Sequence, residues 1–253
     1  MPIDQNERGG DVRCQKGQPG IDVTPPAKSV RTFRRAILQW ARRRGLRNLP
    51  WRQDDATAYQ RIIAEVLLQR TRAETVAGFF RRFVRRFPSW RALAQAKETE
   101  LKQFLRPIGL WRRRSLSLGR LAKQMASRQG QFPKTRSEIE ALPGVGQYIA
   151  NAILTICHRE RRPLLDVNMA RVLERYFGPR RLADIRYDAY LQRLATEVVD
   201  YHDALLVNWA VLDFAALVCT ARAPHCSCCP LVDECRFAKE HSKGRTSAAV
   251  SRV

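Results

Sequence analysis

The chain has 253 residues, 45% of them hydrophobic, and is therefore long enough to bury one large core or two smaller ones. Its 46 Lys and Arg outnumber its 24 Asp and Glu, and the resulting formal charge of +22 favours a polyanionic partner, DNA or RNA. A membrane partner is disfavoured because no apolar run reaches the ~18 residues of a spanning helix, and the N-terminus lacks the apolar segment of a secretory signal, so we expect an intracellular protein.

Helical signals dominate the chain after a polar N-terminal segment. Residues 1–28 are rich in Gly, Pro and charge, which predicts a disordered tail, and the spacing of Phe33, Ile37, Trp40 and Ala41 then predicts an amphipathic helix with a cationic outer face. Further helices are predicted over 59–68, 73–86, 90–96, 98–104, 112–127, 137–142, 147–158, 168–176, 187–199 and 203–218. Convincing period-two strands are lacking, so we predict an all-α fold, with a second disordered tail over 242–253.

A glycine-containing turn, Leu142-Pro143-Gly144-Val145-Gly146, joins two of these predicted helices. Its glycines permit a tight turn with positive φ, which leaves backbone N–H groups at the start of the next helix free to bind a phosphate. An ordinary helix–helix connection is the alternative. The apolar Leu-Pro that enters the turn and a carboxylate further along the chain, Asp166, favour the DNA-binding interpretation.

Five of the seven cysteines fall between Cys219 and Cys235. So uneven a distribution indicates a metal site in a reducing compartment rather than a disulfide scaffold. Four thiolates in a short segment suit either zinc or an iron–sulfur cluster on chemistry alone. The two remaining cysteines, Cys14 and Cys157, are interpreted as free thiols.

Several separated motifs, in order, resemble the helix–hairpin–helix superfamily of base excision DNA glycosylases, which includes endonuclease III and the adenine and thymine mismatch glycosylases. The resemblance covers about residues 48 to 236 and rests on Leu49–Arg52, Ala64–Thr71, Ile108–Leu110, Leu142–Leu154, Leu165–Asn168 and the cysteine cluster. It implies a six-helix domain with the hairpin, over 53–162. It also implies an iron–sulfur cluster domain that combines 29–52 with 163–241, and a DNA-binding cleft between the two.

The resemblance also implies a reaction. Bifunctional members of the family have a lysine in the helix after the hairpin, whereas this chain has Gln147-Tyr148-Ile149 there, so the implied enzyme hydrolyses the N-glycosidic bond without a lyase lysine. Asp166 matches the family's catalytic aspartate, whose carboxylate would stabilise oxocarbenium charge and orient the attacking water. Capping of the helix that begins at Val167 is the alternative role, and both roles can hold together.

Glu65 and Tyr148 are the remaining candidates for the base pocket. Glu65 stands in an otherwise apolar helical stretch, where partial burial would raise its pKa. In the family's mismatch enzymes a glutamate here faces the flipped base, although an ion pair with one of many arginines is the alternative. Tyr148 resembles the thymine–guanine branch, since adenine-removing relatives usually have a small hydroxyl residue there, and packing in the helix interface is its alternative role.

The implied DNA contacts are Gln69, Arg70, Leu110, Gly144, Val145, Gly146 and Gln147. Gln69 or Arg70 would fill the space left by the flipped nucleotide, and Leu110 matches a residue that wedges into the duplex. Gln69 resembles the adenine branch and Arg70-Thr71 the thymine branch, and we expect no C-terminal recognition domain of the kind that adenine enzymes use to read 8-oxoguanine. We therefore expect thymine or uracil opposite guanine as the target, with adenine excision or non-catalytic DNA binding as alternatives.

Cys219, Cys226, Cys229 and Cys235 have the spacing of the family's [4Fe–4S] site. Cys228 is adjacent to Cys229, so a change of ligand register remains open, although it would break the family spacing. The resemblance implies that the cluster braces the C-terminal end and positions the loop Arg222–His225 against phosphates. The expected partner is double-stranded DNA with a mismatched or damaged base, bound by a monomer.

Overall fold

The computed structural model describes residues 25–247, and the side chains of residues 25–241. Its α-helices are α1 (Ala27–Arg44), α2 (Ala58–Leu68), α3 (Ala73–Arg86), α4 (Trp90–Gln95), α5 (Glu98–Leu105), α6 (Trp111–Ser127), α7 (Arg136–Glu140), α8 (Gln147–Cys157), α9 (Val167–Phe177), α10 (Ala189–Val199), α11 (Ala204–Leu217) and α12 (Arg236–Ser247). Short 3-10 turns are η1 (Pro50–Arg52), η2 (Arg106–Ile108) and η3 (Cys226–Cys228). Residues 25–247 contain no strand, which confirms the all-α prediction.

At both ends of the described residues, a helix runs into a segment that was predicted to be a disordered tail. Helix α1 begins at Ala27, within the segment predicted as a tail, because Val30 already packs into a core. Helix α12 was not predicted, and its second half lies inside the predicted tail 242–253. A tertiary contact anchors α12, because the Arg175 guanidinium lies 4.7 Å from the centre of the Phe237 ring. The polar sequence of this segment gives no sign of that contact. The rest of both predicted tails, 1–24 and 248–253, lies outside the described residues.

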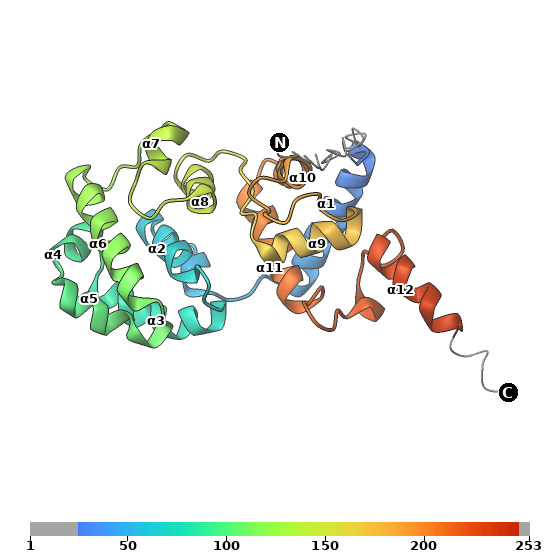
Figure 1. Ribbon diagram of the computed structural model, residues 1–253, viewed down its shortest axis with the longest axis horizontal. Coiled ribbons are helices and arrows are strands. Elements are labelled where there is room, and N and C mark those ends of the chain that lie inside the picture. Colours follow the sequence, from blue (N-terminus) through green and yellow to red (C-terminus); the bar gives the residue numbers. More distant parts are fainter. Residues whose placement is uncertain (1–24, 248–253) are drawn as a thin grey trace, which may run out of the picture.

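The helices pack around two hydrophobic cores (Figure 1). Helices α2 to α8 surround the first core, on the left of the view, and α1 packs with α9, α10 and α11 around the second. The seven helices α2 to α8 are one more than the resemblance implied, and the shortest of them is the five-residue α7. Leu49, Trp51 and Leu164 belong to the first core, although they were expected with the second domain. Because α1 packs against α11, two helices far apart in the sequence belong to the same half.

Helix α1 shows how the sequence pattern produces this packing. Phe33 and Ile37 are fully buried, and Ala41 is nearly so, as the amphipathic spacing predicts. Trp40 packs edge-on against Phe214 of α11, with ring centres 5.2 Å apart. The arginines of the last turn face the negative end of the helix dipole, which favours them there.

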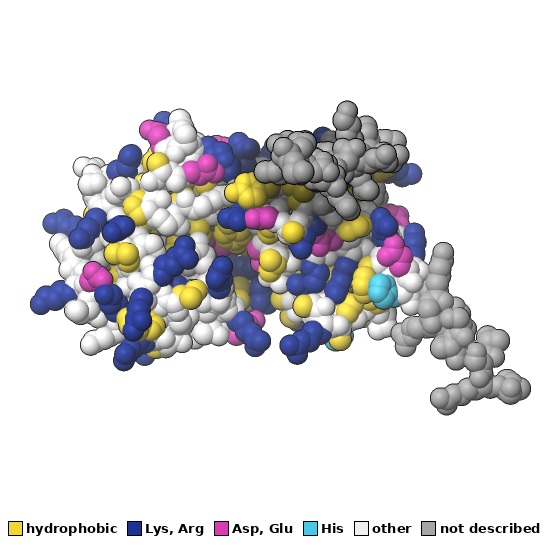
Figure 2. Space-filling view, viewed as in Figure 1, with side chains coloured by type: hydrophobic (Ala, Val, Ile, Leu, Met, Phe, Trp, Pro, Cys, Tyr) yellow, Lys and Arg dark blue, Asp and Glu magenta, His cyan; other side chains and the backbone are white. Residues whose placement is uncertain are grey.

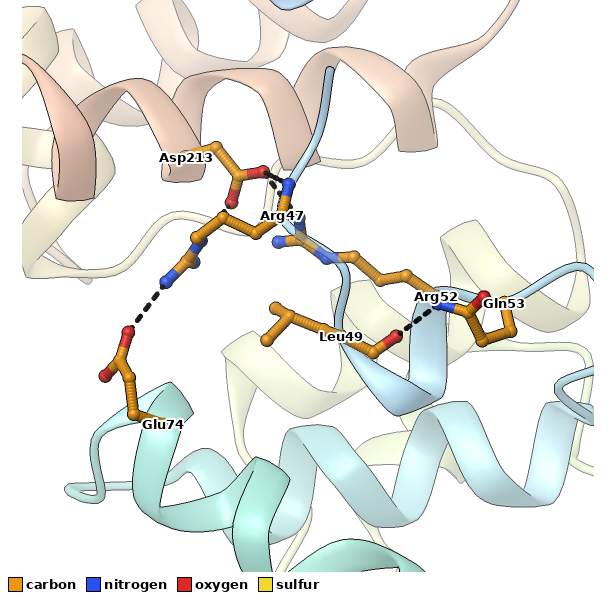
Figure 3. A network of polar contacts seen from close by, with 6 residues as sticks. All are labelled: Arg47, Leu49, Arg52, Gln53, Glu74 and Asp213. Atoms are coloured by element: carbon orange, nitrogen blue, oxygen red, sulfur yellow. Dashed lines mark hydrogen bonds and ion pairs between the residues drawn. The ribbon is translucent and has the colours of Figure 1, made fainter. Parts of the chain in front are cut away.

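A buried acid holds the segment in which the chain first passes from one core to the other, between α1 and α2 (Figure 3). Asp213 of α11 has no exposed surface and accepts hydrogen bonds from the Arg47 backbone N–H at 2.8 Å, Arg47 Nε at 2.7 Å and Arg52 Nη1 at 2.8 Å. Arg47 also reaches Glu74 of α3 at 3.3 Å. Removing one partner from such a buried network leaves an uncompensated charge, which is strongly destabilising. The network therefore holds the segment that leads from α1 into α2.

The surface is rich in positive charge. Figure 2 shows Lys and Arg side chains over both halves of one face, with Asp and Glu more sparsely placed among them. Within residues 25–247, no helix combines the length and the apolar character needed to cross a membrane. The exposed charge suits a polyanion.

Candidate active site

Glu65 and Tyr148 meet where α2 packs against α8. A capping box between Thr57 and Gln60 starts α2, and its buried face carries Glu65 among apolar side chains. Glu65 is 4% exposed, and the partly buried Tyr148 donates a hydrogen bond from Oη to Glu65 Oε2 at 2.9 Å. The fold therefore joins two predicted site residues that lie 83 positions apart in the chain.

The surroundings of Glu65 favour its protonated form. Burial raises its pKa to about 7, and the negative charge of Asp166 adds to the rise. The hydrogen bond from Tyr148 and the positive charge of Arg52 act in the opposite direction without cancelling it. Burial also raises the pKa of Tyr148 well above its ordinary value, so this phenol stays protonated as a donor. Glu65 can therefore gain or lose a proton near neutral pH.

Asp166 caps α9, as the alternative interpretation predicted. Its Oδ1 accepts hydrogen bonds from the backbone N–H groups of Asn168 at 2.9 Å and Met169 at 2.8 Å. Its Oδ2 is also engaged, because the Asn168 side-chain amide donates to it at 2.6 Å. Each carboxylate oxygen can accept more than one hydrogen bond, so capping leaves acceptor capacity for a water or a developing cation. Asp166 is only partly buried, unlike Glu65.

Two buried asparagines hold the segment that delivers Asp166 to the site. Asn151 of α8 donates from Nδ2 to the carbonyl of Pro163 at 2.8 Å. Asn208 of α11 accepts from the Leu164 backbone N–H at 2.6 Å and donates to the carbonyl of Arg162 at 3.0 Å. Fully paired buried polar groups of this kind make a segment rigid. Sequence reasoning missed both asparagines, although an amide inside an apolar helix is a signal for such a role.

Arg52 is a further residue that sequence reasoning left without a role. It appeared only within the motif Leu49–Arg52, yet its side chain is buried and its charge lowers the pKa of Glu65. Asp213 holds its Nη1, and its guanidinium lies 5.1 Å from the centre of the Trp209 ring. The available signal was Asp213 itself, since an acid in the apolar run Ala210–Leu217 requires a cationic partner.

The hairpin turn lies between α7 and α8. Gly144 has a φ of 76°, and a Cβ there would lie 3.0 Å from the Cβ of Ser117, so conformation and space both require glycine. Gly146 is the N-cap of α8, and no side chain caps the first N–H groups of this helix. The Val145 side chain is buried in the first core, and Gln147 Nε2 donates to Gln192 of α10 at 3.2 Å. Backbone N–H groups are therefore what the turn offers an anion.

Two exposed loops of the first half carry the other predicted DNA contacts. Gln69 and Arg70 are exposed in the loop before α3, and Leu110 is 50% exposed directly before α6. Arg70 and Leu110 have φ values of 56° and 51°, a left-handed conformation that costs a residue with a side chain about 1–2 kcal/mol. The loops touch, because Thr71 Oγ1 donates to the carbonyl of Ile108 at 3.3 Å.

The four predicted cysteine ligands line one small cavity. These ligands are Cys219, Cys226, Cys229 and Cys235. Cys228 does not line it, and its exposed thiol contacts the carbonyl of His225 at 3.5 Å. Within the described residues, no three His, Cys, Asp or Glu side chains gather closely enough to hold a single metal ion. Four thiols that line one cavity match the donor set of a cluster that takes one thiolate at each iron.

The chain is similar to known base excision repair proteins. The family model described as HhH-GPD superfamily base excision DNA repair protein matches residues 63–196. The chain is 37% identical over 227 residues to a thymine/uracil-DNA glycosylase of Pyrobaculum aerophilum, covering 88% of this chain and 98% of the relative. It is also 37% identical to a thymine-DNA glycosylase of Aeropyrum pernix, over 82% of this chain and 95% of that one. Among solved structures, a thermostable thymine-DNA glycosylase matches with a TM-score of 0.74 at 27% identity, over 84% of this chain and 98% of that one.

Proposed function

Because this chain belongs to the HhH-GPD superfamily of base excision DNA repair proteins, we propose that it is a DNA glycosylase that excises thymine or uracil paired with guanine. One observation carries the proposal: a buried Glu65, hydrogen-bonded by Tyr148, lies close enough to Asp166 for the two carboxylates to interact. Two relatives, each matched over nearly its whole length, are named as thymine/uracil-DNA and thymine-DNA glycosylases.

Asp166 would act on the sugar. Breaking the bond between N1 of the base and C1′ leaves positive charge on the sugar ring, which an adjacent ionised carboxylate stabilises. A water held by the same carboxylate adds to C1′ and passes its proton to Asp166. The products are an abasic site and the free base.

Glu65 and Tyr148 would act on the base. The base departs with the electron pair of the broken bond, so a proton or a hydrogen bond delivered to one of its carbonyl oxygens lowers the barrier. Glu65 suits this role because burial raises its pKa to about 7, close to the pH of a neutral solution. Tyr148 orients the Glu65 carboxyl through the hydrogen bond to Oε2, and its ring offers an aromatic wall to a flipped pyrimidine.

The exposed loops and the hairpin would hold the duplex. Gln69 and Arg70 would occupy the gap left by the extruded nucleotide, and Leu110 would insert between base pairs. Gly144 and Gly146, with the backbone of Val145 and Gln147, would bind a phosphate at the start of α8. Because phosphate contacts release counterions, binding would weaken steeply as salt concentration rises.

The activity is tested with duplexes that differ only in one pair: T·G, U·G, A·G and A·8-oxoguanine. After incubation with the full chain, alkali cleaves every abasic site that excision has produced. We expect cleavage of the thymine and uracil strands only. Cleavage confined to the adenine strands would instead support the adenine alternative, and no cleavage with intact binding would support a DNA clamp.

We also propose that excision is monofunctional, because Gln147, Tyr148 and Ile149 provide no amine at the start of α8. Borohydride reduces a Schiff base to a permanent cross-link between enzyme and DNA. Incubation of the chain with a T·G duplex and borohydride should therefore leave no covalent adduct on a denaturing gel. Efficient trapping would show that an amine elsewhere attacks C1′.

The cysteine cavity is the proposed seat of a [4Fe–4S] cluster held by Cys219, Cys226, Cys229 and Cys235. Such a cluster supplies a rigid cross-link among its thiolate ligands, and here it would brace the segment between α11 and α12. Iron and sulfide analysis with visible absorption should detect it in protein purified without oxygen. Cys219→Ser should lose the absorption, whereas Cys228→Ser, outside the cavity, should keep it.

A further inference from the structure

The two loop tips proposed to enter the duplex share one internal anchor, Arg114. This residue lies on α6 and is 5% exposed, and its guanidinium contacts both loops. Nη1 donates to the carbonyls of Ile108 at 3.1 Å and Gly109 at 2.7 Å. Nη2 donates to the carbonyl of Gln69 at 2.9 Å, to Thr71 Oγ1 at 3.1 Å and to the carbonyl of Leu67 at 3.3 Å.

Arg114 therefore performs a different task from the many surface arginines. No ion pair to it is found among the described residues, so its charge serves hydrogen bonds to backbone carbonyls rather than a carboxylate. A planar fork with five donors can bind several carbonyls at fixed angles, which a lysine cannot. The residue joins two segments that are 40 positions apart in the chain, at Gln69 and Gly109.

The two segments are held in conformations that they would not adopt alone. Arg70 and Leu110 stand directly beside residues whose carbonyls Arg114 binds, and both have positive φ. Such conformations persist where the surroundings enforce them, and they concentrate at sites of binding and catalysis. The guanidinium of Arg114 enforces them from the protein interior.

Helix α6 also supports the hairpin turn. Ser117 lies one turn after Arg114 on α6, on the same side of the helix, and its Cβ would be 3.0 Å from a Cβ at position 144. The two loop tips and the turn at Gly144 are therefore arranged along one face of one helix. That arrangement gives all three a common support, which suits simultaneous contact with a single duplex.

We infer that Arg114 is a positioning residue that fixes the Gln69–Arg70 tip and the Leu110 tip as one rigid unit for extrusion of the target base. This inference rests on the proposed function. Unstacking a base costs free energy. The side chains that take the place of the base must offset that cost. A loop that is ordered before binding pays no ordering entropy at that moment, so a pre-fixed pair of tips extrudes the base more effectively than two independent loops.

The test compares Arg114→Met with Arg113→Met. Arg113 is adjacent and exposed, so its replacement removes the same charge without touching the loop carbonyls. Two quantities are measured on a T·G duplex with 2-aminopurine beside the mismatch: fluorescence, which rises on extrusion, and the single-turnover excision rate at saturating enzyme. We expect Arg114→Met to lower the fluorescence amplitude and to slow excision about 10- to 100-fold, as misplacement of site groups does, while Arg113→Met stays within about twofold of the parent.

Equal behaviour of the two variants would overturn the inference, and so would slower excision with an unchanged fluorescence amplitude. If circular dichroism shows that Arg114→Met does not fold, Thr71→Val is the second variant. It removes the hydrogen bond from Thr71 to Ile108 and the one from Arg114 to Thr71, while Arg114 itself stays. It should lower both readouts in the same direction, by a smaller factor, and no change in either would overturn the inference. Fluorescence without excision in the parent chain would refute the glycosylase proposal but would still test Arg114. A parent chain that gives neither signal would refute both.

A double-mutant cycle provides an independent readout. If Arg114 makes the tips one unit, Gln69→Ala and Leu110→Ala should be non-additive in their effect on the fluorescence amplitude. In the Arg114→Met background the same two changes should become additive. Additivity in both backgrounds would show that the tips act separately and would contradict the inference.

Discussion

The two carboxylates of the candidate site stand in contrasting surroundings, although the negative charge of Asp166 still raises the pKa of Glu65. Glu65 is enclosed by the first core, between α2 and α8, with one hydrogen bond from Tyr148. Asp166 lies at the edge of the second core, where the amides that begin α9 bind it. Burial favours the protonated form of Glu65, whereas the carboxylate of Asp166 is occupied by hydrogen bonds from N–H groups. The same functional group can therefore serve as acid on one side and as base on the other.

Asp166→Asn gives the largest expected effect. Asparagine is as good an N-cap as aspartate, so α9 should begin normally, but the charge that stabilises the sugar cation is lost. Single-turnover excision of thymine from a T·G duplex should fall by at least about 10³-fold while duplex affinity is kept. A variant with near-normal activity would remove Asp166 from the chemistry and leave it only as a helix cap.

Glu65→Gln should have a smaller effect that depends on pH. The amide keeps an acceptor for Tyr148 but cannot donate a proton, so excision near pH 6 should slow about 10²-fold. In the parent chain the rate should decline as pH rises through about 7, where Glu65 ionises. The variant should lack this decline, and a decline that persists in it would assign the titration to another group.

The stability of the fold should report the same ionisation. The pKa of Glu65 lies at about 7 in the folded chain against an ordinary value of 4.5, so the folded state holds a proton that the unfolded state releases. The contribution of this proton to the free energy of unfolding is fully present below pH 4.5 and is lost as pH rises through about 7. The free energy of unfolding should fall by on the order of 3 kcal/mol over that range. Urea unfolding of the parent and Glu65→Gln should therefore show the parent losing stability relative to the variant across that window. A pH-independent difference would mean that Glu65 is ionised throughout.

Tyr148→Phe should give the smallest change. The variant keeps the aromatic wall but removes the hydrogen bond that lowers the pKa of Glu65, so the alkaline decline of the rate should move above pH 7. The maximal rate should fall only by about the value of one hydrogen bond, on the order of tenfold. An unchanged pH profile would show that the phenol does not control the ionisation of Glu65.

The two carboxylates also show how far the sequence alone can lead. The all-α fold and most helix bounds followed from apolar periodicity, because most of the helices bury one face and expose the other. Glu65 was recognisable as an acid in an apolar stretch, and Asp166 as a cap within a family motif. Arg114 was not recognisable, because its role depends on carbonyls brought together from distant segments. Helix α12 was missed because its anchor, Arg175 over Phe237, is a tertiary contact.

The way in which the chain passes between its halves has a mechanical consequence. It crosses once through Arg47 and Arg52, held by Asp213, and once through Leu164, held by Asn208. Both holders lie on α11, so the two crossings are tied to the same helix. Closing the halves around DNA would break buried contacts, whereas bending a duplex costs only several kcal/mol, ~1–6 by elastic estimates. We therefore expect the DNA to bend on binding while the two halves of the protein keep their relative positions.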